Sequence, residues 1–203
     1  MLKGFLFDLD GTLWDSEKTI KTILQSSVES KAKIIENDIL DELKNSISPM
    51  EILKKYEIPK ESYWNLYRKN YAEIKLFFTD TPEVLETLLR RGKSVGFITS
   101  LKKEFVMSLL EKFGLLKYAQ VLITPSECRT AKPSPTPVIM ALNKLSIENV
   151  QAIYIGDQNS DILAAKRAGC KSGLAKWGNR TVNETPDYVF EKLDDILLLR
   201  EEG

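Results

Sequence analysis

From residue 81 onwards the chain alternates short apolar segments with single helical segments, and this order constrains the fold more than any other feature. The apolar segments have the length of strands and lie at 93–99, 120–123, 151–155 and 172–175. Helices are expected at 81–91, 102–113, 135–145 and 160–168, with a last one at 192–200. Single helices between strands imply right-handed crossovers, parallel strands and two covered sheet faces. With a first strand at 3–9, the sequence predicts a doubly wound, three-layer Rossmann-like α/β fold.

The segment 15–79 interrupts this order with charged sequence of helical period. One helix is expected to begin at Pro49, because the stretch SPME has capping-box spacing with proline at the first helical position. An aromatic stripe follows at helical spacing, and we interpret it as a packing face: Tyr63, Trp64, Tyr67 and Tyr71. We therefore expect a core formed by residues 1–14 and 80–203 and an inserted helical domain formed by residues 15–79.

Composition argues against several classes of partner. The chain has 29 basic and 29 acidic residues, so it has no net charge that would attract nucleic acid or an anionic membrane. No apolar run approaches the roughly 18 residues of a membrane span, and the N-terminus has no signal-peptide pattern. Cys128 and Cys170 lack CxxC spacing and are expected to be reduced thiols of a cytoplasmic protein. Nothing in the sequence indicates an oligomeric state.

The chain contains no histidine. This absence excludes serine–histidine triads, acid–base catalysis by imidazole and histidine metal sites. Any chemistry must therefore use carboxylates, lysine, hydroxyl groups and the backbone.

Polar side chains follow several of the predicted strands, directly or after a loop. These residues are Asp8 and Asp10, Thr99 and Ser100, Lys132, and Asp157 and Asp161. In a doubly wound sheet, ligands bind beyond the carboxyl ends of the strands, where the strand order reverses. The sequence therefore predicts that these side chains lie along one edge of the sheet.

Several acids in one cleft need a counter-charge. Two carboxylates 4 Å apart repel each other by about 4 kcal/mol at an effective dielectric near 20, so protons or a cation must neutralise them. Oxygen ligands without histidine or cysteine favour Mg²⁺, which binds carboxylates, water and phosphate. Lys132 and Thr99 can donate to phosphate oxygens, and Gly11 and Gly156 allow close approach of the backbone. This residue set suits a phosphoryl group beside Mg²⁺.

These segments resemble the four motifs of the haloacid dehalogenase-like superfamily, in the order that the family has them. FDLDGT at 7–12 is similar to the first motif, and Thr99 after an apolar strand is similar to the second. Lys132-Pro133 resembles the third motif, and GDQNSD at 156–161 resembles the fourth. The helical insert and the stretch after Asp161 look most like the phosphoglycolate phosphatase-like branch, whose insert is an all-helical cap. The resemblance covers nearly the whole chain.

The resemblance implies a Mg²⁺-dependent phosphatase of a small phosphorylated metabolite. Asp8 is the implied nucleophile, which forms an aspartyl-phosphate, and Asp10 is the implied general acid and then base. The implied metal ligands are Asp8, the backbone carbonyl of Asp10, and Asp157. Thr99 and Lys132 are expected to stabilise the phosphoryl oxygens. The implied phosphate-binding residues are Asp8, Leu9, Asp10, Thr99, Ser100 and Lys132.

Some assignments stay open within this resemblance. Asp161 lies one helical turn beyond Asp157, so it could reach the metal through water or hold Lys132. Ala131 replaces a glycine that is frequent in the family, and Gln158 replaces a smaller polar residue. Neither departure affects the core roles. The substrate is not indicated; phosphoglycolate, sugar phosphates and nucleoside monophosphates are candidates, and selectivity is expected in the cap.

Two other functions are compatible with parts of this pattern. Sugar phosphomutases similar to beta-phosphoglucomutase share the core, but they carry a cap histidine that this chain lacks. A phosphoacceptor module would place an acid after the third strand, where this chain has Thr124 and Pro125. A dehalogenase is disfavoured by Asp10, because that branch lacks the second aspartate. Trp14, next to the first motif, is expected to pack in the interior.

Overall fold

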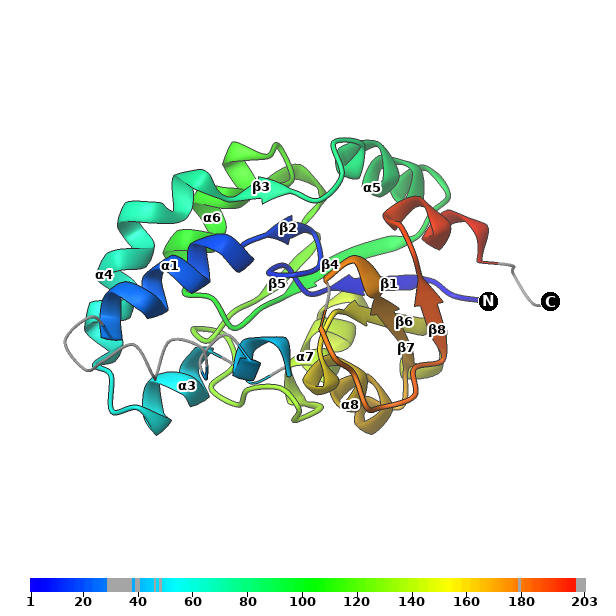
Figure 1. The fold of residues 1–203 in the computed structure, drawn as a ribbon. Helices are drawn as coiled ribbons and strands as arrows, with labels where there is room; N and C mark the ends of the chain where they lie inside the picture. Colours follow the sequence, from blue (N-terminus) through cyan, green and yellow to red (C-terminus); the bar gives the residue numbers. More distant parts are fainter. Residues whose placement is uncertain (29–37, 39–40, 46, 48, 179, 200–203) are drawn as a thin grey trace.

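The computed structural model describes residues 1–28, 38, 41–45, 47, 49–178 and 180–199. Its centre is a parallel six-stranded sheet with the order β5-β4-β1-β6-β7-β8 (Figure 1). The strands are β1 (Gly4–Phe7), β4 (Ser94–Ile98), β5 (Val121–Ile123), β6 (Ala152–Gly156), β7 (Lys171–Ala175) and β8 (Tyr188–Phe190). Strands β4 and β5 lie on one side of β1, and β6 to β8 lie on the other. The predicted doubly wound α/β sheet is confirmed.

Helices cover both faces of this sheet (Figure 1). They are α5 (Thr81–Arg90) and α6 (Lys103–Lys112) on one face, and α7 (Thr136–Leu145) and α8 (Asn159–Ala168) on the other. Because side chains alternate along a strand, Phe5 and Phe7 join the apolar cluster of α5 and α6, whereas Leu6 joins that of α7 and α8. Both faces of β1 are thus buried, which explains its continuous apolar sequence.

The C-terminal part differs from prediction in two places. Strand β8 has only three residues, one of them half-buried and one exposed, so the sequence shows no clear strand pattern there. The helix expected at 192–200 is a shorter 3₁₀ helix, η5 (Leu193–Leu198); Leu199 lies outside it, and residue 200 is not among the described residues. The Asp195 carboxylate accepts hydrogen bonds from the backbone N–H groups of Glu191 and Lys192, which stabilises the start of this short helix.

The insert contains α1 (Glu17–Val28), α3 (Pro49–Lys55), α4 (Lys60–Asn70) and the 3₁₀ helix η1 (Tyr71–Glu73). Helix α3 begins at the predicted Pro49. The sequence did not predict the short antiparallel pair β2 (Trp14–Asp15) and β3 (Lys75–Leu76), which joins the two connections to the insert. No helix within the described ranges is long and apolar enough to span a membrane.

Helix α4 packs against the core through its aromatic residues. Tyr63 and Tyr67 are buried, and the Tyr67 ring centroid lies 4.9 Å from that of Phe105 on α6. The Trp64 ring stacks on Phe105 at 5.6 Å. The interpretation of this stripe as a packing face is therefore confirmed for these residues. Trp14 is also fully buried, as expected.

Candidate active site

Three neighbouring strands end at the same place. In the order β4-β1-β6, Phe7 pairs with Phe97 on one side and with Ile155 on the other. The backbone N–H of Asp8 donates to Ile155 at 2.8 Å, which continues the β1–β6 pairing by one residue. Asp8, Thr99 and Asp157 therefore follow adjacent strand ends, and all three side chains are buried. The structure brings these predicted site residues together as the topology requires.

Lys132 reaches this strand edge from the loop between β5 and α7. Its Nζ lies 2.9 Å from Asp8 Oδ1 and 2.6 Å from Asp161 Oδ1, and only 9% of its side chain is exposed. Asp161 also accepts a hydrogen bond from the Tyr154 hydroxyl at 2.9 Å and from the Gln158 backbone N–H at 3.1 Å. Of the two possibilities that the sequence left open for Asp161, the structure shows direct contact with Lys132.

Asp157 occupies a cradle formed by two glycines. A Cβ atom added to Gly11 would lie 2.2 Å from Asp157 Oδ2, and one added to Gly178 would lie 2.4 Å from Asp157 Cβ. Gly11 also has a φ of +83°, which L side chains rarely adopt. The backbone at Gly11 and Gly178 thus approaches the Asp157 side chain so closely that any larger residue at either position would displace Asp157.

The acids form a group that suits a hard cation. Carboxylate oxygens of Asp8, Asp157 and Asp161 all lie within 4.8 Å of one another. Within the described part of the chain, the buried Asp157 Oδ2 accepts no hydrogen bond, and Oδ1 accepts only a long one of 3.5 Å from the Thr12 hydroxyl. Oxygen ligands of this kind fit Mg²⁺ better than a soft metal. Asp8 and Asp157 were predicted as metal ligands, whereas the Asp161 carboxylate forms an ion pair with Lys132.

Burial controls the protonation of these acids. Desolvation raises the pKa of Asp8 to about 7, with Lys132 acting in the opposite direction. Desolvation also raises the pKa of Asp157 well above its ordinary value, and the neighbouring Asp161 and Asp8 charges add to this effect. The site therefore takes up protons near neutral pH unless a cation compensates its charge.

Among the described residues, Asp10 is not part of the acid group of Asp8, Asp157 and Asp161. Its Oδ1 accepts a hydrogen bond from Trp14 Nε1 at 2.8 Å. Burial raises the pKa of Asp10, and hydrogen bonds from Ser16 and Trp14 oppose the shift. This arrangement leaves the Asp10 backbone carbonyl, rather than its carboxylate, as the candidate metal ligand, and it suits a carboxyl group that donates and accepts a proton.

The other predicted phosphate-binding residues occupy different environments. The Thr99 hydroxyl accepts a hydrogen bond from the Leu101 N–H at 3.1 Å, so its own proton remains available for donation. The Ser100 side chain is exposed. The Leu9 side chain is fully buried in the core, so only its backbone can contribute. Cys128 and Cys170 are both buried free thiols, as expected.

Sequence reasoning missed Arg180, which lies beyond β7. Its Nε is 3.7 Å from Asp157 Oδ2, and only 7% of its side chain is exposed. Tyr154, which orients Asp161, was also missed, because a tyrosine inside an apolar strand has the pattern of a core residue. No local pattern marks Arg180, since its contacts are made with residues that are distant in the sequence.

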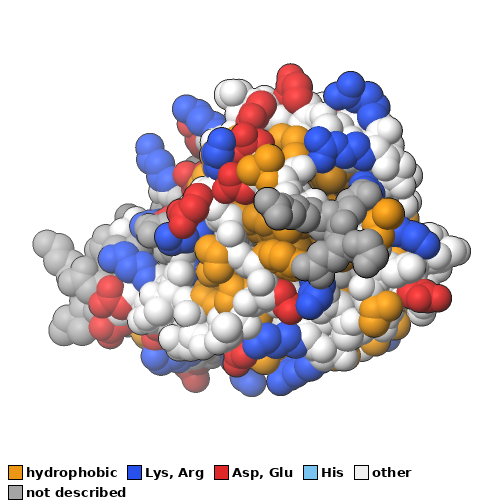
Figure 2. All heavy atoms as spheres, turned by 90° about the vertical axis from the view of Figure 1, so that its right-hand side faces the viewer, with side chains coloured by type: hydrophobic (Ala, Val, Ile, Leu, Met, Phe, Trp, Pro, Cys, Tyr) orange, Lys and Arg blue, Asp and Glu red, His pale blue; other side chains and the backbone are white. Residues whose placement is uncertain are grey.

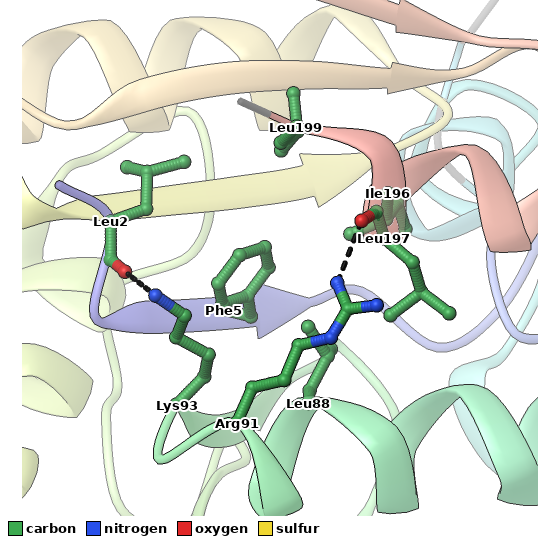
Figure 3. A pocket seen from close by; sticks show the side chains of 8 residues that line it. All are labelled: Leu2, Phe5, Leu88, Arg91, Lys93, Ile196, Leu197 and Leu199. Atoms are coloured by element: carbon green, nitrogen blue, oxygen red, sulfur yellow. Dashed lines mark hydrogen bonds between the residues drawn. The ribbon is translucent and has the colours of Figure 1, made fainter. Parts of the chain in front are cut away.

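A pocket of about 260 Å³ lies away from this site. Figure 3 shows Leu2, Phe5, Lys93 and Leu199 among its lining residues, at the end of β1 opposite to Asp8. Lys93 donates to the Leu2 carbonyl at 2.9 Å, and Arg91 donates to that of Leu197. On the face shown in Figure 2, apolar side chains gather near the middle and charged side chains surround them. None of the described residues that line the pocket is an acid.

The comparisons with known proteins agree with this geometry. The model of the family described as haloacid dehalogenase-like hydrolase matches residues 5–175. The chain belongs to the haloacid dehalogenase-like hydrolases. The matched range extends from β1 to the end of β7 and so includes Asp8, Lys132 and Asp157.

Individual relatives are similar over almost the whole chain. A phosphoglycolate phosphatase of Aquifex aeolicus (strain VF5) is 31% identical over 98% of this chain and 96% of its own length. The pyrophosphatase PpaX of Oceanobacillus iheyensis is 29% identical over 98% of this chain and 96% of its own length. The crystal structure of a hydrolase from Pseudomonas syringae matches 97% of this chain and 96% of that chain, with a TM-score of 0.80 and 21% identity. The predicted class of enzyme, a phosphatase of this family, agrees with the names of the two sequence relatives.

Proposed function

We propose that the protein is a Mg²⁺-dependent phosphatase that hydrolyses a small phosphorylated metabolite through an aspartyl-phosphate. The observation that carries this proposal is the 2.9 Å contact of Lys132 with Asp8, beside an Asp157 oxygen that accepts no hydrogen bond from the described residues. A nucleophilic carboxylate, a fixed ammonium and a free metal-binding oxygen are the groups that phosphoryl transfer needs.

Asp8 is the proposed nucleophile. One of its oxygens forms a bond to phosphorus while the bond from phosphorus to the leaving oxygen breaks. Lys132 holds the Asp8 carboxylate in place and offsets charge on the phosphoryl oxygens, and the Thr99 hydroxyl donates to one of them. Water then attacks phosphorus, which releases inorganic phosphate and restores Asp8.

Asp10 is the proposed general acid and base. Its carboxyl protonates the leaving oxygen in the first step and takes a proton from water in the second. Burial favours the protonated form that the first step needs, and the hydrogen bond from Trp14 keeps the carboxyl oriented. A divalent cation at Asp8, the Asp10 carbonyl and Asp157 would supply the positive charge that offsets the phosphate dianion.

The proposed substrates are phosphoglycolate or a sugar phosphate. The similarity to a phosphoglycolate phosphatase supports the first of these. We propose that residues 15–79 form a cap over the substrate; the packing of Tyr67 on Phe105 joins α4 of this insert to α6 of the core. We also propose a cytoplasmic location and no nucleic-acid or membrane partner, because the thiols are free and the net charge is zero.

Hydrolysis of p-nitrophenyl phosphate with MgCl₂ tests this function directly. We expect turnover by the unmodified protein and none by Asp8→Asn, which should keep its fold. Asp10→Asn should lower kcat by a factor of about 10² to 10⁴, the usual contribution of general acid–base catalysis. Asp15→Asn is a matched control, because Asp15 is exposed and its Oδ1 accepts only a backbone hydrogen bond from Glu17 among the contacts described.

The outcomes separate this proposal from its alternatives. A stable phosphoprotein without turnover would indicate a phosphoacceptor module instead. Near-normal rates in Asp8→Asn would overturn the assignment of the nucleophile. A panel of phosphorylated metabolites, assayed by phosphate release, would then identify the substrate.

A further inference from the structure

The turn that carries Asp10 is closed by its own hydrogen bonds. The backbone N–H of Trp14 donates to the Leu9 carbonyl at 3.2 Å, and that of Gly11 donates to the Trp14 carbonyl at 2.9 Å. The Trp14 indole also donates to the Asp10 carboxylate at 2.8 Å. We call residues 9–14 the Asp10 turn. Because these bonds join its members to one another, the position of the turn decides the position of the Asp10 carboxyl.

A second tryptophan fastens the Asp10 turn to the sheet. Trp177 Nε1 donates to the Thr12 carbonyl at 2.7 Å, although 165 residues separate the two positions. Trp177 belongs to the 3₁₀ helix η4 (Lys176–Gly178), which directly follows β7. Leu174, close to the end of β7, pairs with both β6 and β8. The hydrogen bond therefore connects the Asp10 turn to a part of the sheet that is held on both sides.

The indole of Trp177 is itself fixed in place. It packs edge-on against Phe78, with the ring centroids 5.1 Å apart and the ring planes at 85°. A Cβ atom added to the next residue, Gly178, would lie 2.5 Å from the Gly11 carbonyl oxygen and 2.4 Å from Asp157 Cβ. The backbone of η4 thus lies directly against the Asp10 turn and Asp157, and it has no space to shift towards either.

The acceptor of this hydrogen bond distinguishes it from ordinary packing. A half-buried indole N–H needs an acceptor in any protein, so the bond alone would indicate only stability. Here the acceptor is the carbonyl of Thr12, two residues after the proposed general acid. The placement of such a group matters for the rate, because a misplacement of about 1 Å can lower it by about 10²-fold.

We propose that Trp177 is a positioning residue for the general acid Asp10. It acts through the Thr12 carbonyl and keeps the Asp10 carboxyl within reach of the ester oxygen of the substrate. In the first step, the Asp10 proton passes to that oxygen while the bond from the oxygen to phosphorus breaks and Asp8 bonds to phosphorus. This inference rests on the proposed function and adds the contact that places its acid.

Leaving groups that differ in their need for a proton test this inference. p-Nitrophenolate leaves readily as an anion, whereas phenyl phosphate has a more basic leaving oxygen and depends more on the acid. Trp177→Phe removes the N–H and keeps an aromatic ring beside Phe78. We expect it to lower kcat/KM for phenyl phosphate by about tenfold, the effect of one hydrogen bond, and that for p-nitrophenyl phosphate by less than about threefold.

Two further variants and one inhibitor serve as controls. Trp177→His is the conservative variant, because its Nε2 lies as many bonds from Cβ as the indole Nε1; it should recover part of the loss on phenyl phosphate. Trp64→Phe makes the matched substitution at a ring that stacks on Phe105, and it should keep the substrate ratio of the unmodified enzyme. Inhibition by inorganic phosphate should be unchanged in Trp177→Phe, because the proposed phosphate-binding residues stay in place.

A double-mutant cycle with Asp10→Asn completes the test. If Trp177 acts through Asp10, Trp177→Phe should have little further effect on the substrate ratio in the Asp10→Asn background. A loss on phenyl phosphate that persists in full in that background would overturn the inference. So would an equal loss for both substrates in Trp177→Phe, because that result would assign Trp177 a purely structural role. Failure of the proposed function has a different signature, since the unmodified protein would then hydrolyse neither ester.

Discussion

Replacing Lys132 by methionine should destabilise the protein strongly. The ammonium lies 2.6 Å from Asp161 and 2.9 Å from Asp8, and the three side chains are 9%, 0% and 6% exposed. Methionine keeps most of the side-chain volume but removes the charge. The change therefore leaves two buried carboxylates without their cation, while the surrounding packing is nearly preserved.

The expected loss follows from the burial of this ion pair. Breaking a buried pair by removal of one partner costs about 3–5 kcal/mol. For a chain of this size, about 1 kcal/mol corresponds to about 2–4 °C in Tm, so Tm should fall by about 6–20 °C.

The loss of stability in Lys132→Met should also depend on pH. Lys132 lowers the pKa of Asp8, which burial raises to about 7, so without Lys132 this pKa rises further. The folded variant then continues to lose stability as pH increases above 7, and the difference from the unmodified protein is larger at pH 8 than at pH 6.

Thermal unfolding in EDTA at pH 6 and pH 8 measures both quantities. Lys176→Met serves as the control, because its exposed ion pair with Glu191 should contribute less than about 1 kcal/mol at either pH. A loss in Lys132→Met as small as that of the control would refute the reasoning. So would a loss that decreases from pH 6 to pH 8, since it would mean that the carboxylates are not compensated by the ammonium.

Two further predictions concern the same site, and a third concerns the buried thiol of Cys170. Gly11→Ala and Gly92→Ala both place alanine at a positive φ, which should cost about 1–2 kcal/mol in urea unfolding for Gly92→Ala and more for Gly11→Ala, whose Cβ also clashes with Asp157. Only Gly11→Ala should also lose activity, because its Cβ displaces Asp157 whereas nothing lies within 4 Å at position 92. MgCl₂ should raise Tm more at pH 8 than at pH 6, because protons compete for Asp8 below its pKa of about 7; an equal rise would contradict this site. Burial raises the pKa of Cys170 to about 12, so native protein at pH 8 should show no reaction of this thiol with Ellman's reagent, in contrast to unfolded protein.

The sheet and its acidic edge were predictable because they depend on patterns that are local in the sequence. Each strand of β1, β4 and β6 is a short apolar run, and the polar residue that follows it marks its end. Parallel pairing then brings these ends together without any knowledge of side-chain contacts. Lys132 was predictable only in combination with the motifs, since a lysine between alanine and proline has no structural signature of its own.

Features that depend on long-range contacts were not predictable. Strands β2 and β3 have two residues each, and their pairing joins positions about 60 residues apart. The contact of Arg180 with Leu43 spans 137 residues, and no periodicity reports it. The orientation of the Asp10 side chain towards Trp14 also follows from the turn between them rather than from either residue type. Sequence patterns therefore predict which strands are followed by polar residues, but not which contacts the side chains of those residues make.

The acid site carries an electrostatic cost that a bound cation would relieve. The folded pKa of Asp8, about 7, lies above its ordinary value of 3.8, so this group favours the folded state below pH 4 and loses that contribution as pH rises to 7. The difference corresponds to a cost on the order of 4 kcal/mol at neutral pH, a substantial part of the stability of a typical domain. Lys132 offsets only part of the negative charge, because Asp161 also engages it. A divalent cation bound at Asp8 and Asp157, as the proposed function requires, would remove the remaining penalty, so the arrangement that destabilises the free protein would favour cation binding.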